Sequence, residues 1–245
     1  GRKMIRAHLA TFPPRRRLLR RTCAAILPQV DHLYVVLNGY EDIPGFLAQD
    51  ARVTAIIPDR DVKDAGKFWF APAPEDIVFT IDDDIGYPPD YVARTLAHLN
   101  AIGPMANVVG YQGNIYVGPR AEPQTVWDNY IFHQPADQVL GASILGTGTL
   151  CARGSSIPPL AAIEPDAGAC DIPFCRWLFE NGILPWILPR PANWLTNDLP
   201  RNLKQSSLFQ TVAKKGHSAY RDLLWSFVTR WPHANIRHDR FARPA

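Results

Sequence analysis

Apolar residues along the first hundred positions switch between the spacing of strands and that of helices. Short apolar runs bounded by turn residues predict four strands, at 4–10, 32–37, 53–57 and 77–81. Apolar residues at helical spacing predict two helices, at 15–27 and 91–99. We expect Asp90 to cap the second helix. Because strands alternate with helices, the pattern predicts βαβ units and a mainly parallel sheet with helices on both faces.

The rest of the chain has a weaker pattern. Strands are predicted within 107–117 and 138–151, and a helix is predicted over 172–181, ended by Gly182. The sequence contains no internal repeat and no low-complexity linker. The simplest organisation is one domain over 1–245, with segments of about 1–100, 101–200 and 201–245, the last a C-terminal helical extension.

Composition and charge exclude several classes of protein. Apolar residues make up 47% and charged residues 20% of the chain, which excludes disorder, collagen and coiled coil as the main state. The net charge is +3, but residues 1–21 and 201–245 are basic, whereas 22–200 is acidic. This distribution gives no continuous basic face, so we expect no nucleic-acid partner.

Cysteine usage and hydropathy indicate the compartment. The cysteines form no C-x-x-C pair and are typical of reduced, buried thiols; they are Cys23, Cys151, Cys170 and Cys175. A Cys170–Cys175 disulfide is the alternative. No apolar run reaches the roughly 18 residues that span a bilayer, and the first residues lack the apolar stretch of a signal peptide. The sequence therefore predicts a cytoplasmic protein.

Three consecutive carboxylates follow the predicted strand at 77–81. Asp82, Asp83 and Asp84 repel one another unless a cation or hydrogen-bond donors compensate their charge. If the strand alternation continues, Asp82 and Asp84 point to one side and Asp83 to the other. Hard oxygen ligands of this kind suit Mg²⁺ or Mn²⁺ shared with substrate phosphates. A solvated acidic turn is the alternative, but sites gather beyond the carboxyl ends of parallel strands, which favours a metal site.

Several segments resemble bacterial glycosyltransferases of the GT-A fold, similar to glycosyltransferase family 2. They are Thr11-Phe12-Pro13-Pro14-Arg15, the strand ending at Asn38, Asp64-Ala65-Gly66-Lys67-Phe68, and Ile81-Asp82-Asp83-Asp84-Ile85-Gly86-Tyr87-Pro88-Pro89-Asp90-Tyr91. The resemblance covers roughly residues 4–190. It implies a Rossmann-like, mainly parallel central sheet with a smaller acceptor-side lobe. It also implies a metal-dependent transfer of sugar, with UDP as the expected nucleotide, to a carbohydrate or lipid-linked glycan in bacterial surface polysaccharide synthesis.

The resemblance assigns roles by position in the first half, the nucleotide-sugar-binding half. Asp84 is the expected direct metal ligand, with Asp82 at the ribose or a metal-bound water. The other expected nucleotide-sugar contacts are Thr11, Pro13, Arg15, Asn38, Asp59, Lys67 and Asp83. Asn38 stands where the family commonly has a carboxylate. A solvated helix start is the alternative interpretation of Arg15.

Further roles fall in the second half, the acceptor-binding half. Transfer with inversion needs a base for the acceptor hydroxyl, and Asp171 at the start of the helix over 172–181 matches the family's position for it. Asp166 and Glu164 are the alternatives, and a retaining reaction would remove this role. Gly146 and Thr147 resemble the loop under the donor sugar.

Two further residues are weaker candidates. Trp194 is a candidate for stacking on the acceptor. His217 is a candidate for contact with the metal or pyrophosphate.

The segment 201–245 contains an amphipathic pattern with aromatic residues from Tyr220 to Trp231. Packing on the domain is one interpretation, and peripheral contact with the inner face of the membrane, helped by nearby basic residues, is the other. The basic excess also suits an anionic acceptor.

Two other functions remain open at this point. A nucleotidyltransferase acting on a sugar phosphate shares the sheet and the metal, but it would need a glycine-rich loop where Thr11–Pro14 has none. A non-catalytic carbohydrate-binding relative would bind sugar without nucleotide.

Overall fold

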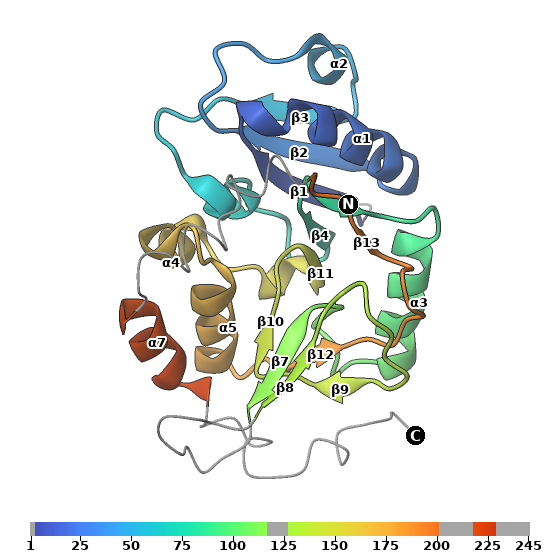
Figure 1. The fold of residues 1–245 in the computed structure, drawn as a ribbon, viewed down its shortest axis with the longest axis vertical. Coiled ribbons are helices and arrows are strands. Elements are labelled where there is room, and N and C mark those ends of the chain that lie inside the picture. The colour runs from blue at the N-terminus through green and yellow to red at the C-terminus, as the bar shows by residue number, and fades with distance from the viewer. Residues whose placement is uncertain (1–2, 117–126, 201–217, 229–245) are drawn as a thin grey trace.

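A large sheet forms the centre of the molecule in the computed structural model, which describes residues 3–116, 127–200 and 218–228 (Figure 1). Its strands in spatial order are β3 (Val53–Ile56), β2 (His32–Leu37), β1 (Ile5–Thr11), β4 (Ile77–Ile81), β11 (Thr149–Arg153), β6 (Val108–Gly110), β12 (Pro185–Ile187) and β9 (Leu140–Gly141). All run in one direction except β11 and β9, which are antiparallel to their neighbours. The predicted mainly parallel sheet is confirmed.

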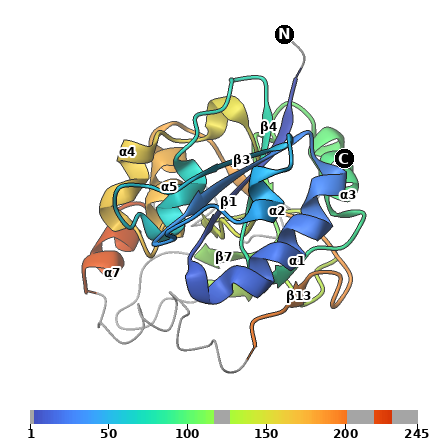
Figure 2. The same cartoon turned by 90° about the horizontal axis from the view of Figure 1, so that it is seen from above.

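The helices cover both faces of this sheet. They are α1 (Arg16–Ile26), α2 (Gly45–Ala48), α3 (Tyr91–Ile102), α4 (Leu160–Ile163), α5 (Asp171–Glu180) and α7 (Ser218–Trp225). Figure 2 shows α1 on one side of the strands and α4 with α5 on the other. Short 3-10 turns join them: η1 (Pro13–Arg15), η2 (Leu27–Gln29), η3 (Lys63–Phe68), η4 (Gly154–Ser156) and η5 (Glu164–Asp166).

Two small sheets complete the second half of the chain. One contains β10 (Ile144–Leu145), β7 (Gly113–Tyr116) and β8 (Trp127–Tyr130), and the other pairs β13 (Thr196–Asn197) with β5 (Ile85–Gly86). The predicted strands within 107–117 and 138–151 are therefore several shorter strands.

The core consists of one apolar cluster on each face. On β4, Ile77, Phe79 and Ile81 belong to the cluster beneath α1 and α3, whereas Val78 belongs to the cluster beneath η3, α4 and α5. This alternation is the period of a strand buried on both faces. The same alternation determines toward which face of the sheet the side chains directly after Ile81 point.

The structure corrects one prediction about a helix end and confirms another. Asp90 precedes α3, but its carboxylate makes no cap hydrogen bond and accepts the indole N–H of Trp194 instead, at 2.9 Å. Gly182 follows the last residues of α5 with a φ of 67°, so the predicted glycine terminator is confirmed.

All four cysteines are free and buried, so the alternative Cys170–Cys175 disulfide does not form. No helix among the described residues has the length and apolar character needed to cross a bilayer.

Candidate functional site

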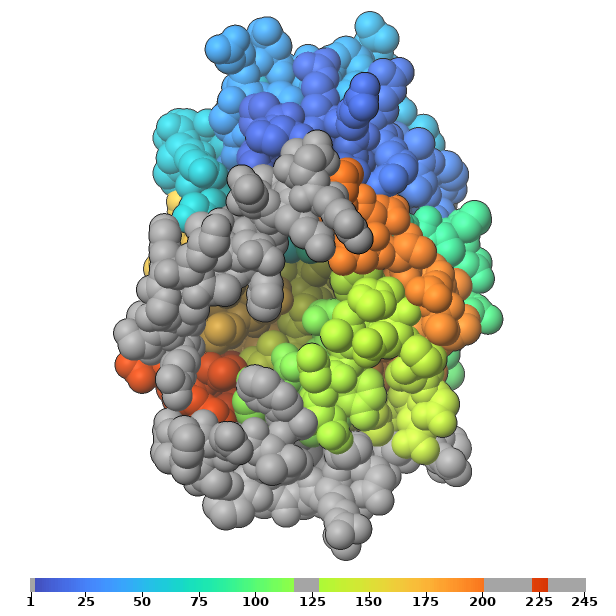
Figure 3. Space-filling model, viewed as in Figure 1, coloured from blue at the N-terminus to red at the C-terminus, as the bar shows by residue number. Residues whose placement is uncertain are grey.

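The candidate site lies where β1 and β4 end, beside the start of β11. In Figure 3 this face of the molecule is hollowed at its centre, below the blue residues of the first strands. β1 and β4 are parallel neighbours, so Thr11 and the Asp82–Asp84 segment leave the sheet at the same edge. β11 runs the other way, and its first residue, Thr149, pairs with Ile81. The loop before β11 therefore reaches the same edge.

Asp83 is held by the chain itself. Its carboxylate accepts the hydroxyl hydrogen of Thr11 at 2.7 Å and pairs with the guanidinium of Arg15 at 2.8 Å. Only 7% of its side chain is exposed, and burial raises the pKa of this carboxyl to about 7 despite the opposing effect of Arg15. The backbone carbonyl of Asp83 also accepts a hydrogen bond from Thr22 on α1. Asp83 thus anchors the acidic segment to β1 and α1.

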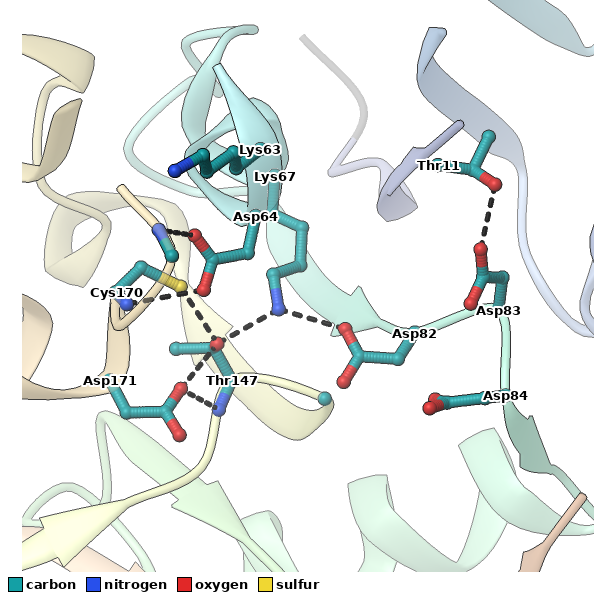
Figure 4. A network of polar contacts seen from close by, with 12 residues as sticks. Thr11, Lys63, Asp64, Lys67, Asp82, Asp83, Asp84, Thr147, Cys170 and Asp171 are labelled. Atoms are coloured by element: carbon teal, nitrogen blue, oxygen red, sulfur yellow. Dashed lines mark hydrogen bonds and ion pairs between the residues drawn. The ribbon is translucent and has the colours of Figure 1, made fainter. Parts of the chain in front are cut away.

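Asp82 and Asp84 remain accessible. Their side chains are 37% and 28% exposed, and Figure 4 shows both carboxylates turned toward the same space, while Asp83 turns toward Thr11. The predicted alternation of the three side chains is therefore confirmed. Arg15 also reaches Asp84 at 3.4 Å, and burial followed by the charge of Asp82 raises the pKa of Asp84.

Lys67 is the cation that faces Asp82. η3 packs closely on β1 and β2 because Gly66 has no side chain: a Cβ there would lie 2.9 Å from Val36. Lys67 is 3% exposed, and its ammonium lies 2.8 Å from Asp82 Oδ1 and 2.9 Å from Thr147 Oγ1. Burial alone would lower the pKa of Lys67, but nearby carboxylates, with Asp82 first, raise it well above its usual value. Lys67 is therefore charged.

Thr147 joins this cation to Asp171. Its backbone N–H and its hydroxyl both donate to Asp171 Oδ1, at 2.9 and 2.6 Å (Figure 4). Asp171 is the first residue of α5, and burial raises the pKa of its carboxyl although Lys67 and Thr147 oppose that shift. The structure thus brings the predicted base into one network with Lys67 and Asp82. Of the alternatives, Glu164 instead pairs with Arg60 at the surface.

Other predicted residues lie outside this network. Asn38 is buried, and its amide clamps the loop before η3 by accepting from Val62 N–H and donating to the Lys63 carbonyl. Asp59 is 80% exposed and pairs with Arg60.

The remaining candidates that the structure describes also lie outside this network. Pro13 is exposed at the start of η1, and Gly146 donates its N–H to the Gln112 carbonyl. Trp194 packs on Tyr111 and Tyr91. His217 lies outside the described residues, as does most of the basic C-terminal segment.

Two residues of the site had no role assigned from the sequence. Asp64 accepts the backbone N–H groups of Gly168 and Cys170, which fixes the approach to α5. The buried hydroxyl of Tyr87 accepts the N–H of Asp82 at 2.8 Å and donates to the Gly148 carbonyl. Asp64 and Tyr87 both lie inside the motifs on which the family resemblance rests. That position was the only sequence feature that could have marked them as site residues.

A divalent cation suits the charges of the acidic segment. The carboxyls of Asp82, Asp83 and Asp84 face two cations, Arg15 and Lys67, and an added cation would relieve the repulsion between Asp82 and Asp84 that helps to raise the pKa of Asp84. Among the described residues, no cluster of three or more His, Cys, Asp or Glu side chains is arranged to hold a metal. Asp82 and Asp84 fit instead the open kind of Mg²⁺ or Mn²⁺ site, where one or two carboxylates share the ion with water and phosphate.

Comparison with known proteins identifies the fold. A mycobacterial protein of solved structure aligns over 87% of this chain and 73% of its own, with 16% identity and a TM-score of 0.51. S. aureus TarS, residues 1–349, aligns over 95% of this chain and 73% of its own, with 10% identity and a TM-score of 0.51. No protein-family model and no curated protein matches the chain.

A third structure aligns over a shorter part. Glucosyl-3-phosphoglycerate synthase from Mycobacterium tuberculosis, in complex with Mn²⁺, UDP-glucose and phosphoglyceric acid, matches 44% of this chain at 22% identity and a TM-score of 0.35. This chain spans 43% of that synthase. With the central sheet described above, the two longer alignments show a GT-A-type α/β fold, and the resemblance predicted from the sequence is confirmed at that level.

Proposed function

We propose that this chain is a metal-dependent glycosyltransferase that moves a sugar from a UDP-linked donor to the hydroxyl of a carbohydrate or lipid-linked glycan, with inversion. One observation carries the proposal: Asp82 and Asp84 are partly exposed and turn to the same side, and Lys67 and Thr147 link Asp82 to Asp171. Donor-binding and base groups are thus joined in one network. Residues of about 101–200 would supply the acceptor side.

The residues of the network have separate tasks in this reaction. Asp82 and Asp84 would hold Mn²⁺ or Mg²⁺, which when bound neutralises the diphosphate leaving group. The bond between the anomeric carbon and the phosphate oxygen breaks, and its electron pair leaves with the nucleoside diphosphate. The acceptor oxygen bonds to the anomeric carbon from the opposite side, and its proton goes to Asp171. Lys67 and Arg15 keep positive charge beside the leaving group.

The decisive experiment combines two substitutions. Asp84→Asn keeps the size of the side chain but removes its charge, so we expect loss of Mn²⁺-dependent binding of UDP by calorimetry. Asp171→Asn should leave that binding in place and lower sugar transfer by about 100-fold or more, the range of general base catalysis. Asp137→Asn, at an exposed carboxylate outside the network, is the matched control. Absence of sugar transfer by the wild type would refute the proposed reaction. Wild-type UDP binding by Asp84→Asn and wild-type transfer by Asp171→Asn would refute the roles given to these two residues.

A further inference from the structure

Thr147 occupies a short connection between two anchored strands. Only residues 146–148 separate β10 from β11, and the side chain of Thr147 is 1% exposed. Gly146 is fixed to the Gln112 carbonyl on one side of it, and Gly148 lies against Asp82 on the other. The hydroxyl therefore has little freedom to change partners.

The partners of this hydroxyl fix the direction of its hydrogen bonds. The Lys67 ammonium can only donate, and the Asp171 carboxylate can only accept. The Thr147 hydroxyl must therefore accept from Lys67 and donate to Asp171. Its hydrogen is used on Asp171, so at the 3.2 Å contact with Cys170 the thiol donates. Burial raises the pKa of that thiol well above its usual value, which keeps its proton in place.

The same arrangement makes the two oxygens of Asp171 unequal. Oδ1 accepts two hydrogen bonds, from the N–H and from the hydroxyl of Thr147. Oδ2 has no hydrogen-bond partner in the described part of the chain, and Asp171 as a residue is partly exposed. A carboxylate free to turn would exchange the two oxygens, and the two bonds to Oδ1 prevent this.

We propose that Thr147 is a positioning residue that locks Asp171 through Oδ1, presents Oδ2 to the acceptor hydroxyl, and couples this orientation to Lys67 on the donor side. The inference rests on the proposed function, because it gives Asp171 the role of base. In the transfer step, the proton of the acceptor hydroxyl goes to Oδ2 and not to Oδ1. Thr147 itself exchanges no proton with substrate.

The test removes only the hydroxyl. Thr147→Val keeps the shape and the backbone N–H, and Thr147→Ser restores the hydroxyl. Thr149→Val is the matched control, because the buried Thr149 hydroxyl has no hydrogen-bond partner in the described structure. We expect Thr147→Val to lower kcat by about 10- to 100-fold while the KM for donor changes less than about threefold. Thr147→Ser should recover most of the rate, and Thr149→Val should match the wild type.

Two measurements separate this inference from the proposed function. The first is a double-mutant cycle of Thr147→Val and Asp171→Asn. Because the two residues act as one unit, Thr147→Val should cause little further loss of kcat when Asp171 is already replaced. If the wild type transfers no sugar from a UDP-linked donor, the proposed function has failed; if Asp171→Asn transfers it at the wild-type rate, the role of Asp171 as base has failed. If Asp171→Asn is inactive but Thr147→Val has the wild-type rate, only this inference has failed.

The second measurement does not need activity. The carboxyl carbon resonance of Asp171 followed against pH should show a higher pKa in Thr147→Val than in the wild type, because a hydrogen bond to the charged form is lost. Thr147→Ser should return the pKa toward the wild-type value. If the valine variant does not fold, Thr147→Ala removes the same hydroxyl with less bulk. An unchanged pKa in a folded variant would overturn the inference.

Discussion

His8 shows how one residue can be held in a single protonation state. The Arg6 guanidinium donates to Nε2 of His8 at 2.9 Å, so Nε2 carries no hydrogen and Nδ1 donates to the Lys67 carbonyl. Burial, followed by the charge of Arg6, lowers the pKa of His8 to about 3. Asp76 pairs with Arg6 at 3.4 Å and completes the group. A neutral histidine thus holds the backbone that bears Lys67.

This arrangement predicts a loss of stability in acid. Unfolded His8 binds a proton below about pH 6.5, whereas folded His8 stays neutral down to about pH 3, so stability falls as the pH drops below 6.5. The cost for this one group is about 2 kcal/mol between pH 7 and pH 5. Urea unfolding at both pH values should show a smaller loss for His8→Asn than for the wild type. Equal losses in the two proteins would refute this role, since contributions of other groups cancel in the difference.

Tyr91 offers a contrasting prediction. Its ring is fully buried, and its hydroxyl has no hydrogen-bond partner among the described residues. Tyr91→Phe should therefore keep stability or raise it by up to about 1 kcal/mol, because a buried hydroxyl without a partner is costly. Tyr111→Phe is the control: it removes a hydroxyl that is bonded to Thr95 at 2.7 Å and should cost about 1 kcal/mol. Chemical denaturation measures both, and a marked loss in Tyr91→Phe would contradict the first prediction.

At the scale of elements, the first four strands were predictable because their local pattern is strong. The runs ending at Leu37 and Ile81 have continuous apolar or β-branched residues and a clear turn after them, and β2 and β4 match the predicted bounds. The burial of the Arg15 side chain could not be predicted from the local pattern, because consecutive arginines at the start of a helix are typical of a solvated surface. Its burial depends on Asp83, 68 positions later in the chain.

The loop before β11 gives a sharper prediction at this scale. A Cβ added at Gly148 would overlap the carboxylate of Asp82, and the backbone has no room to move away because Tyr87 binds the Gly148 carbonyl. Gly148→Ala should therefore displace Asp82 and weaken Mn²⁺ binding by about tenfold or more, as loss of an orienting neighbour does in metal sites. Gly45→Ala on α2, where a Cβ meets only ordinary contact, is the control. Calorimetric titration with Mn²⁺ measures both, and equal affinities would contradict the prediction.

At the scale of the whole molecule, the sequence was enough to predict the fold class but only part of the candidate site. Alternating strands and helices are a local signal, so the mainly parallel sheet could be predicted. The link from Lys67 to Thr147 joins residues 80 positions apart, and it exists only because β11 enters the sheet in reverse beside β4. The glycines before β11 predicted a bend in the chain. No local pattern predicts whether the strand after the bend runs parallel or antiparallel to its neighbours.

The whole domain should respond to donor and metal together. Binding to the folded state alone raises its stability by about 2.7 kcal/mol at a ligand concentration of 100 times Kd. For a chain of this size we expect the melting temperature to rise by about 5–10 °C with UDP and Mn²⁺ together. Each alone should give a smaller shift, because the diphosphate and the carboxylates of Asp82 and Asp84 would share the ion. Equal shifts with UDP alone, or a larger response to other nucleotides, would contradict the expected donor.

The reversed strand β11 also limits how proteins of this architecture can diverge. Hydrogen bonds join residues 146–148 to Gln112, Tyr87 and Asp171, and both ends of the turn continue directly into paired strands, so the turn has no room for insertions or deletions. One added residue would shift Thr149 against Ile81 and turn every following side chain of β11 to the opposite face. Changes of chain length are therefore expected in other loops around the sheet, while the turn at 146–148 keeps its length.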